Sequence, residues 1–192
     1  MIFILGGEEP NTYRAYLMNG ADANGHVIKK RGEPPVAIVN PMEIDEARPS
    51  GLTLYTPEDF GAGEIRKQFK GDRAGILKAQ MAAYFDKLGL RGRLGLYGTG
   101  DVYLAAHLIH EVLSVLPGVE LAFDYPASQL FQEAYETKDS AEIEQLKLVA
   151  RLSSEAVKAV HEFITQHRAN SDGLVVNSDG QPLTIGAVKR FI

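Results

Sequence analysis

Short apolar runs alternate with amphipathic stretches over the first two thirds of the chain. The apolar runs are bounded by Gly, Pro, Asn or Asp, which is typical of buried strands. The amphipathic stretches repeat apolar residues at helical spacing. We expect strands at residues 1–5, 52–56, 93–98 and 119–124, and a hairpin at residues 26–40 whose tip holds Gly32, Pro34 and Pro35.

Two helices between these strands have clear start and stop signals. The first covers residues 71–89, with Asp72 as its cap and Gly89 as its stop, and the second covers residues 101–116, capped by Asp101. Shorter helices are expected at residues 41–47 and 128–136, and a turn or short helix leads into an irregular loop within residues 11–25. This alternation predicts an α/β layered domain over residues 1–136, with a mixed sheet flanked by helices.

A long amphipathic helix follows in "ETKDSAEIEQLKLVARLSSEAVKAVHEFI", which begins at Glu136. Asp139 or Ser140 can cap it, and a helix that reaches His167 would be roughly 40 Å long. We expect part of its apolar stripe to need a partner outside the small preceding domain. Residues 137–192 therefore form the connecting helix and the start of a second, truncated domain. The stripe holds Ile143, Leu146, Val149, Ala150, Leu152, Ala156, Val157, Val160, Phe163 and Ile164.

Composition narrows the classes of partner. The 192 residues carry a net charge of −5, and a mildly acidic chain argues against nucleic acid or an anionic membrane as the main partner. The chain has no cysteine, which excludes disulfides, thiolate nucleophiles and cysteine zinc sites and fits a reducing cytoplasm. The apolar start, Met1–Leu5, is too short for a signal sequence or a membrane span. We expect a cytoplasmic protein without nucleic-acid or membrane partners.

The turn "YGTGDVY" is a candidate ligand site. Gly98 and Gly100 follow a predicted strand and open a predicted helix, which is the context of a dinucleotide fingerprint, but Tyr103 stands where that fingerprint has its third glycine. A tight turn capped by Asp101 explains both glycines without a ligand, and the aspartate would repel a phosphate. Nucleotide binding at Gly98, Gly100 and Asp101 remains the alternative interpretation.

A second candidate is a pair of histidines on one predicted helix. His107 and His110, followed by Glu111, are three residues apart, whereas paired zinc histidines on a helix are four apart and need a third ligand. Partly exposed helix histidines are therefore the favoured interpretation. From these patterns we predict no catalytic residue and no metal ligand in this chain.

Three stretches resemble the amino-terminal part of the pita-bread metallopeptidases, the family of Xaa-Pro aminopeptidases, prolidases and creatinase. They are "NTYRAYLMNGADANGHVIKKRGEPPVAIVNPMEIDEA", "LRGRLGLYGTGDVY" and, in the connection between the domains, "TKDSAEIEQLKLVARLSSEAV". A fourth stretch, "PLTIGAVKRFI", is similar to the second helix of the catalytic domain in some members. The chain departs from the family pattern by reading "YLMNGA" in the early segment and by opening directly on its first strand.

The resemblance implies a ribonuclease-H-like layering for the first domain and a metal-dependent hydrolase as the parent protein. The family's two-metal site uses two Asp, one His and two Glu from a region that would follow Ile192, so none of these ligands falls on this chain. The parent would bind two divalent metals, such as Mn, Co or Zn, and act on peptides. Its partners would be its own catalytic domain and a second subunit.

The resemblance also marks one early segment. In the family, loops of the amino-terminal domain help to form the dimer and border the partner's substrate cleft. Tyr13, Arg14 and Tyr16, with Asn19 and Asp22 in the loop that follows, match that region. The alternative is that Tyr16 and Leu17 simply pack beneath the hairpin. We therefore expect a non-catalytic domain of an Xaa-Pro peptidase, and the alternatives are a free-standing small-ligand or nucleotide-binding module and a catalytically inactive interaction module.

Overall fold

The computed structural model describes residues 1–7, 10–98, 101–113, 116–123 and 129–192. The chain divides into two compact units, Met1–Gln132 and Glu133–Ile192. The sequence placed its domain boundary after residue 136, and the division between the units falls a few residues earlier. Each unit is described by itself below.

Unit 1 is built on a six-stranded sheet with the order β4-β3-β2-β1-β5-β6. β2 runs antiparallel to β1 and β3, and all the other pairs are parallel. The predicted mixed sheet is thus confirmed, and the hairpin supplies its antiparallel strand. The strands are β1 (Ile2–Ile4), β2 (Gly25–Lys29), β3 (Val36–Val39), β4 (Thr53–Tyr55), β5 (Gly92–Tyr97) and β6 (Val119–Leu121).

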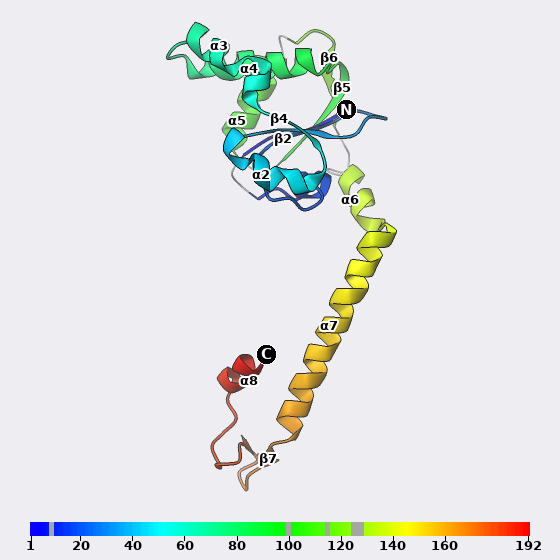
Figure 1. Cartoon of the computed structure of the whole chain (residues 1–192), viewed down its shortest axis with the longest axis vertical. Helices are drawn as coiled ribbons and strands as arrows, with labels where there is room; N and C mark the ends of the chain where they lie inside the picture. Colours follow the sequence, from blue (N-terminus) through cyan, green and yellow to red (C-terminus); the bar gives the residue numbers. More distant parts are fainter. Residues whose placement is uncertain (8–9, 99–100, 114–115, 124–128) are drawn as a thin grey trace. The chain divides into compact units, whose positions relative to one another are not determined.

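Helices lie on both sides of this sheet, with α3 and α4 on one side and α2 on the other (Figure 1). The α-helices of unit 1 are α1 (Thr12–Leu17), α2 (Ile44–Ala47), α3 (Ala62–Gln68), α4 (Arg73–Lys87) and α5 (Val102–His107), and α6 (Gln129–Glu136) spans the division between the units. Three 3-10 turns accompany them, at Pro41–Glu43, Arg48–Ser50 and Pro57–Phe60.

The capping signals in the sequence act as expected around α4. The side chain of Asp72 accepts a hydrogen bond from the backbone N–H of Gly75 at 2.9 Å, which satisfies one of the free amides of the first turn. Gly89 follows the last turn with φ 62°, a left-handed conformation that glycine adopts without strain. The helix predicted over residues 71–89 is confirmed as Arg73–Lys87.

The helix predicted over residues 101–116 is only partly regular. α5 passes into a π-helical turn, Leu108–Val112, and residues 114–115 lie outside the described part of the chain. Val112, at the end of this turn, and the following Leu113 are both buried against the core.

The main core lies between one face of the sheet and α4. Phe3 from β1 stacks on Phe85 from α4, with ring centroids 5.6 Å apart, and Phe60 meets Tyr84 edge-on at 4.8 Å. Because side chains alternate along a strand, Ile4 faces the opposite side, and it is also fully buried. The other buried members of this core are Ile28, Ile38, Met81, Leu90, Leu94, Val112 and Leu113.

Unit 2 consists of α7 (Ser140–Thr165), a two-stranded hairpin of β7 (Arg168–Ala169) and β8 (Val175–Val176), and α8 (Ile185–Phe191). α7 is the long helix that the sequence predicted, and it ends two residues before the expected His167. Asp139 caps it in a capping box: its carboxylate accepts from the N–H of Glu142, and the Glu142 carboxylate accepts from the N–H of Asp139, both at 2.9 Å. No residue from 133 to 192, all of which are described, is buried.

None of the helices in the described ranges combines the length and apolar character that crossing a membrane requires. α7 is long enough, but charged side chains interrupt it on every turn, as the ion pairs Lys147–Glu144 and Lys158–Glu162 illustrate.

Candidate functional site

The early segment that the sequence analysis selected, residues 13–22, contains side chains of two kinds. Some pack against the domain, and others form hydrogen bonds to it. Tyr13 lies against Tyr97 and Phe131, with ring centroids 5.9 Å and 4.7 Å away, and Tyr16 meets Phe131 edge-on at 6.3 Å. Arg14 is buried, with 5% of its surface exposed. These side chains attach α1 to the domain.

The loop after α1 carries the other two residues of that segment. Asn19 has a left-handed backbone, with φ 53°, and its side-chain amide donates to the carbonyl of Ser50 at 2.7 Å. Asp22 is exposed and lines a shallow depression of about 170 Å³ that also includes Arg14. The structure thus brings Arg14 and Asp22 together at this depression, whereas Tyr13, Tyr16 and Asn19 do not line it.

The turn after β5 has the geometry of a strand-to-helix connection. Gly98 has φ 150°, which favours glycine, and a Cβ there would lie 3.4 Å from the Asn11 side chain. Asp101 accepts a hydrogen bond from the N–H of Tyr103 at 2.7 Å, so its carboxylate caps α5. Gly100 lies outside the described residues. The cap accounts for Asp101 without a ligand, as the turn interpretation expects.

The helix histidines do not converge. The His107 ring stacks on Tyr103, with centroids 6.2 Å apart, whereas His110 is largely exposed and lies 3.8 Å from Glu111. Glu111 also pairs with Lys78 at 3.5 Å. Over the described ranges, no group of three His, Asp or Glu side chains is placed to hold a metal ion.

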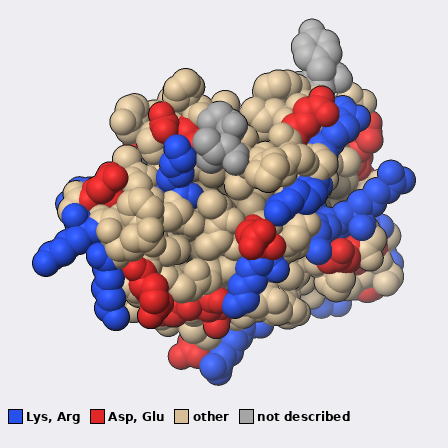
Figure 2. Space-filling model, turned by 90° about the horizontal axis from the view of Figure 1, so that it is seen from above, with Lys and Arg blue, Asp and Glu red and all other residues tan. Residues whose placement is uncertain are grey.

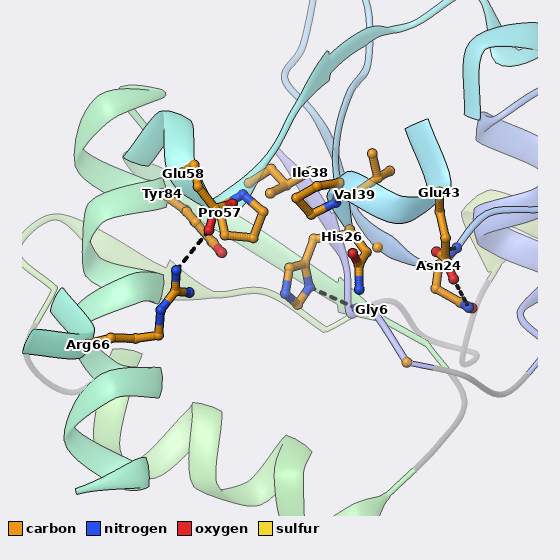
Figure 3. Close-up of a pocket in the computed structure, with 14 residues that line it drawn as sticks. Gly6, Asn24, His26, Ile38, Val39, Glu43, Pro57, Glu58, Arg66 and Tyr84 are labelled. Atoms are coloured by element: carbon orange, nitrogen blue, oxygen red, sulfur yellow. Dashed lines mark hydrogen bonds and ion pairs between the residues drawn. The ribbon is translucent and has the colours of Figure 1, made fainter. Parts of the chain in front are cut away.

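A cavity of about 520 Å³ lies instead at the edge of the sheet where β1, β3 and β4 end and β2 begins (Figure 3). In open α/β sheets, ligands bind outside the carboxyl ends of the strands, and this cavity has that position. Its charged side chains and its histidine come from four places: His26 at the start of β2, Glu43 in the turn after β3, Glu58 after β4, and Arg66 on α3.

His26 has a fixed tautomer. Its Nδ1 accepts a hydrogen bond from the backbone N–H of Gly6 at 2.8 Å, so the neutral ring carries its proton on Nε2. Burial lowers the pKa of His26 to about 4, and the nearby Arg14 charge contributes to that shift. The ring packs between Phe3 and Tyr84, with centroids 5.2 Å and 5.9 Å away. At neutral pH, His26 is therefore an uncharged hydrogen-bond donor.

Arg14 lies next to this cavity and forms hydrogen bonds to two residues that line it, Gly7 and Asn24. Its guanidinium donates to the carbonyl of Gly7 at 2.9 Å and to the side-chain oxygen of Asn24 at 3.2 Å. Asn24 in turn donates from its backbone and side-chain nitrogens to the two oxygens of Glu43, at 2.8 Å and 2.9 Å. This chain of hydrogen bonds fixes the loops after β1, before β2 and after β3 in one arrangement.

The opposite wall carries an ion pair and a phenol. Arg66 donates to Glu58 at 2.9 Å, and this hydrogen bond lowers the pKa of Glu58. Burial, together with the Glu58 charge, raises the pKa of the Tyr84 hydroxyl to about 12, so the phenol stays protonated. Arg66 and Glu58 are each about half exposed at the mouth.

Two glycines make this edge of the sheet possible. A Cβ on Gly6 would lie 2.8 Å from the backbone of Gly25, and a Cβ on Gly25 would lie 2.3 Å from the carbonyl oxygen of Ile38. Both contacts are with backbone atoms, which cannot move aside cheaply. The loop after β1 and the start of β2 thus approach so closely that only glycine fits.

Sequence reasoning did not identify this cavity. The sequence pattern places His26 in a hairpin, and it does not predict α3, which supplies Arg66, because the apolar residues of that helix are few. A usable signal exists in "LGG" and "NGH", where glycines end one strand and begin the next. This pattern predicts that two backbone segments approach each other closely, but it does not predict which other side chains line the cavity.

The charged side chains alternate in sign on the face that Figure 2 displays. Lysines and arginines lie beside aspartates and glutamates across the described part of that face. Binding to a phosphate backbone uses a continuous basic area, which this view does not contain.

Comparisons with protein-family models, with curated proteins and with solved structures found no match to this chain. The candidate site is therefore described by its own geometry alone.

Proposed function

We propose that the chain is the non-catalytic amino-terminal domain and connecting helix of a metal-dependent hydrolase similar to the Xaa-Pro peptidases, prolidases and creatinase. In this proposal unit 1 contributes to dimer formation and to the walls of a peptide-binding cleft. The catalytic reaction itself belongs to a second domain. The protein is cytoplasmic in this proposal.

The topology of the sheet is the main support for this proposal. One antiparallel strand, β2, in an otherwise parallel sheet with helices on both sides is the mixed layering that the resemblance to this family implies. That architecture supports a ribonuclease-H-like classification of unit 1. The early segment with Tyr13, Arg14 and Tyr16 packs into this layered domain, so its outer surface can serve at an interface.

The apolar side of α7 is the second support. Leu146, Val149 and Leu152 are each more than half exposed, and Val157 is 70% exposed. A helix with such a stripe is stable in a folded protein when the stripe packs against another element. Since unit 2 has no core of its own, a catalytic domain or a second subunit is the proposed cover.

The metal ions of this family do not fit the described residues. Two divalent ions need a cluster of carboxylates with a histidine, and the described residues contain no group of three potential ligands. His110 and Glu111 lie 3.8 Å apart, but the His107 ring stacks on Tyr103, and the three side chains do not form such a group. The proposal therefore assigns the two metals, Mn, Co or Zn, to a domain that is not part of this sequence.

The test is to read the coding sequence beyond the codon for Ile192 and to assay its product. The proposal predicts a continuation with Asp, Asp, His, Glu and Glu in that order, and hydrolysis of Xaa-Pro dipeptides that requires added Mn²⁺ or Co²⁺. The 192-residue chain alone should be inactive in the same assay. A stop codon at that point, or a product without metal-dependent hydrolysis, would refute the proposal in favour of a ligand-binding or interaction module.

A further inference from the structure

The cavity at the end of the sheet has an unused hydrogen-bond donor at its centre. Among the described residues, none accepts a hydrogen bond from the Nε2–H of His26, although Gly6 fixes the opposite side of the ring. Figure 3 draws His26 between the Glu58–Arg66 pair and the Asn24–Glu43 pair. His26 is half-buried and lines the cavity, and its Nε2 is not one of the fully enclosed polar atoms, so this donor is open to an acceptor from a ligand.

The second donor is the hydroxyl of Tyr84. Tyr84 is buried, with 4% of the residue exposed, and its hydroxyl has no hydrogen bond with any residue that the structure describes. The ring centroids of Tyr84 and His26 are 5.9 Å apart, so both residues line the same part of the cavity. Two uncharged donors close together suit one oxygen acceptor such as a carbonyl.

The mouth supplies an acceptor. Arg66 holds Glu58 with one hydrogen bond, and a carboxylate has room for several donors. The lining holds two carboxylates, Glu43 and Glu58, but only one guanidinium, that of Arg66, so it is net negative. A phosphate or a free carboxylate would meet two carboxylates and an uncharged imidazole, which disfavours an anion.

We propose that this cavity binds a small uncharged ligand with an amide or lactam group. The carbonyl oxygen accepts from the Nε2–H of His26 and the hydroxyl of Tyr84, and the ligand N–H donates to Glu58. Ile38 and Val39 provide the apolar side of the cavity. This inference does not rest on the proposed function, since the whole site lies in unit 1.

The experiment is a titration of the whole ¹⁵N-labelled chain, observed by NMR at the backbone amides of Gly6 and Gly25. N-acetylglycinamide represents an open-chain amide, uracil represents a lactam, and acetate and inorganic phosphate represent anions. We expect saturable shifts with one or both amide probes and none with the anions. Tighter binding of N-acetylglycinamide would identify a peptide-like ligand, and tighter binding of uracil a cyclic one.

Two variants separate binding from folding. Tyr84→Phe removes one oxygen atom and should weaken the binding of the amide probe by about two- to tenfold, as expected for one neutral hydrogen bond. Tyr55→Phe removes a hydroxyl from β4 at a residue outside the cavity lining, so it should leave the affinity unchanged. The proposal is overturned if neither amide probe saturates, if an anion binds more tightly than both, or if Tyr84→Phe and Tyr55→Phe bind equally well.

Discussion

The two units of this chain achieve their structure by different means. Unit 1 contains every buried apolar residue that the structure describes, from Phe3 to Phe131. Unit 2 contains no buried residue and is held by local features, namely the capping box at Asp139 and the stacking of Phe163 on Phe191 at 4.3 Å. We therefore expect unit 1 to fold by itself, because it has a hydrophobic core. The stability of unit 2 depends instead on helix formation and on a partner that covers its apolar stripe.

The comparison also explains where a small-ligand cavity can form. A cavity keeps its shape only if the loops around it are fixed, and the Arg14–Asn24–Glu43 hydrogen bonds fix those of unit 1. In unit 2 the concave region along α7, lined by Ser153, Val157 and His161 among others, lies on one exposed helix. Such a surface suits a protein partner better than a small molecule.

The largest expected difference between the units comes from truncating one apolar side chain in each. Phe85→Ala should lower the free energy of unfolding of unit 1 by about 3–5 kcal/mol, because it leaves a cavity in the core. Leu152→Ala, at a site 53% exposed, should change stability by less than about 0.5 kcal/mol. Urea unfolding followed by tyrosine fluorescence measures unit 1, since only Tyr135 lies in unit 2. A comparable loss in both variants would mean that the α7 stripe is packed.

The next effect is a dependence of unit 1 stability on pH. His26 has a folded pKa of about 4 against an ordinary value of 6.5, so between these values the unfolded state binds more protons than the folded state. The free energy of unfolding should therefore fall as the pH falls from 7 to 4, by up to about 3 kcal/mol from this residue.

The variant His26→Gln isolates this contribution, and the exposed His161 in α7 provides a control. Unfolding in urea at pH 7.5 and pH 4.5 should show a smaller loss at low pH for His26→Gln than for the natural chain. His161→Gln should lose as much as the natural chain. Equal losses in all three proteins would mean that His26 is protonated in the folded state.

The smallest of these effects concerns helix caps. Asp139→Ala removes half of the capping box and should destabilise the first turn of α7 by about 0.5–2 kcal/mol, with faster amide exchange at Glu142 and Ile143. Asp72→Ala removes the corresponding cap of α4 and should lower the unfolding midpoint of unit 1. If Asp139→Ala also lowered that midpoint, the two units would unfold together.

Local signals in the sequence predicted most of the fold. Caps and stops such as Asp72, Gly89 and Asp139 act over a few residues, so they can be recognised without knowing the neighbours. The hairpin and the mixed character of the sheet followed from the alternation of apolar runs with helices, whereas the order of the strands in the sheet was not predicted. The short helix α3 was missed because it lies on the surface and buries only Ala62 fully.

The candidate site was harder to predict because its residues come from separate parts of the chain. His26 and Tyr84 are brought together by the packing of α4 on the sheet, and Arg66 reaches Glu58 across a turn. Arg14 was singled out from the sequence as an interface residue. The structure buries it and connects it to Asn24, a partner that residue spacing alone does not identify.

Native-state hydrogen exchange of the whole chain tests the central claim, that unit 1 has its own core and unit 2 does not. We predict that amides of β1, β2 and β5 exchange only by global unfolding of unit 1. Amides in the middle of α7, around Leu152, should exchange at least about a hundredfold faster, at a rate that does not change when unit 1 is stabilised. Exchange around Leu152 as slow as in β1, in a dilute monomeric sample, would contradict the account.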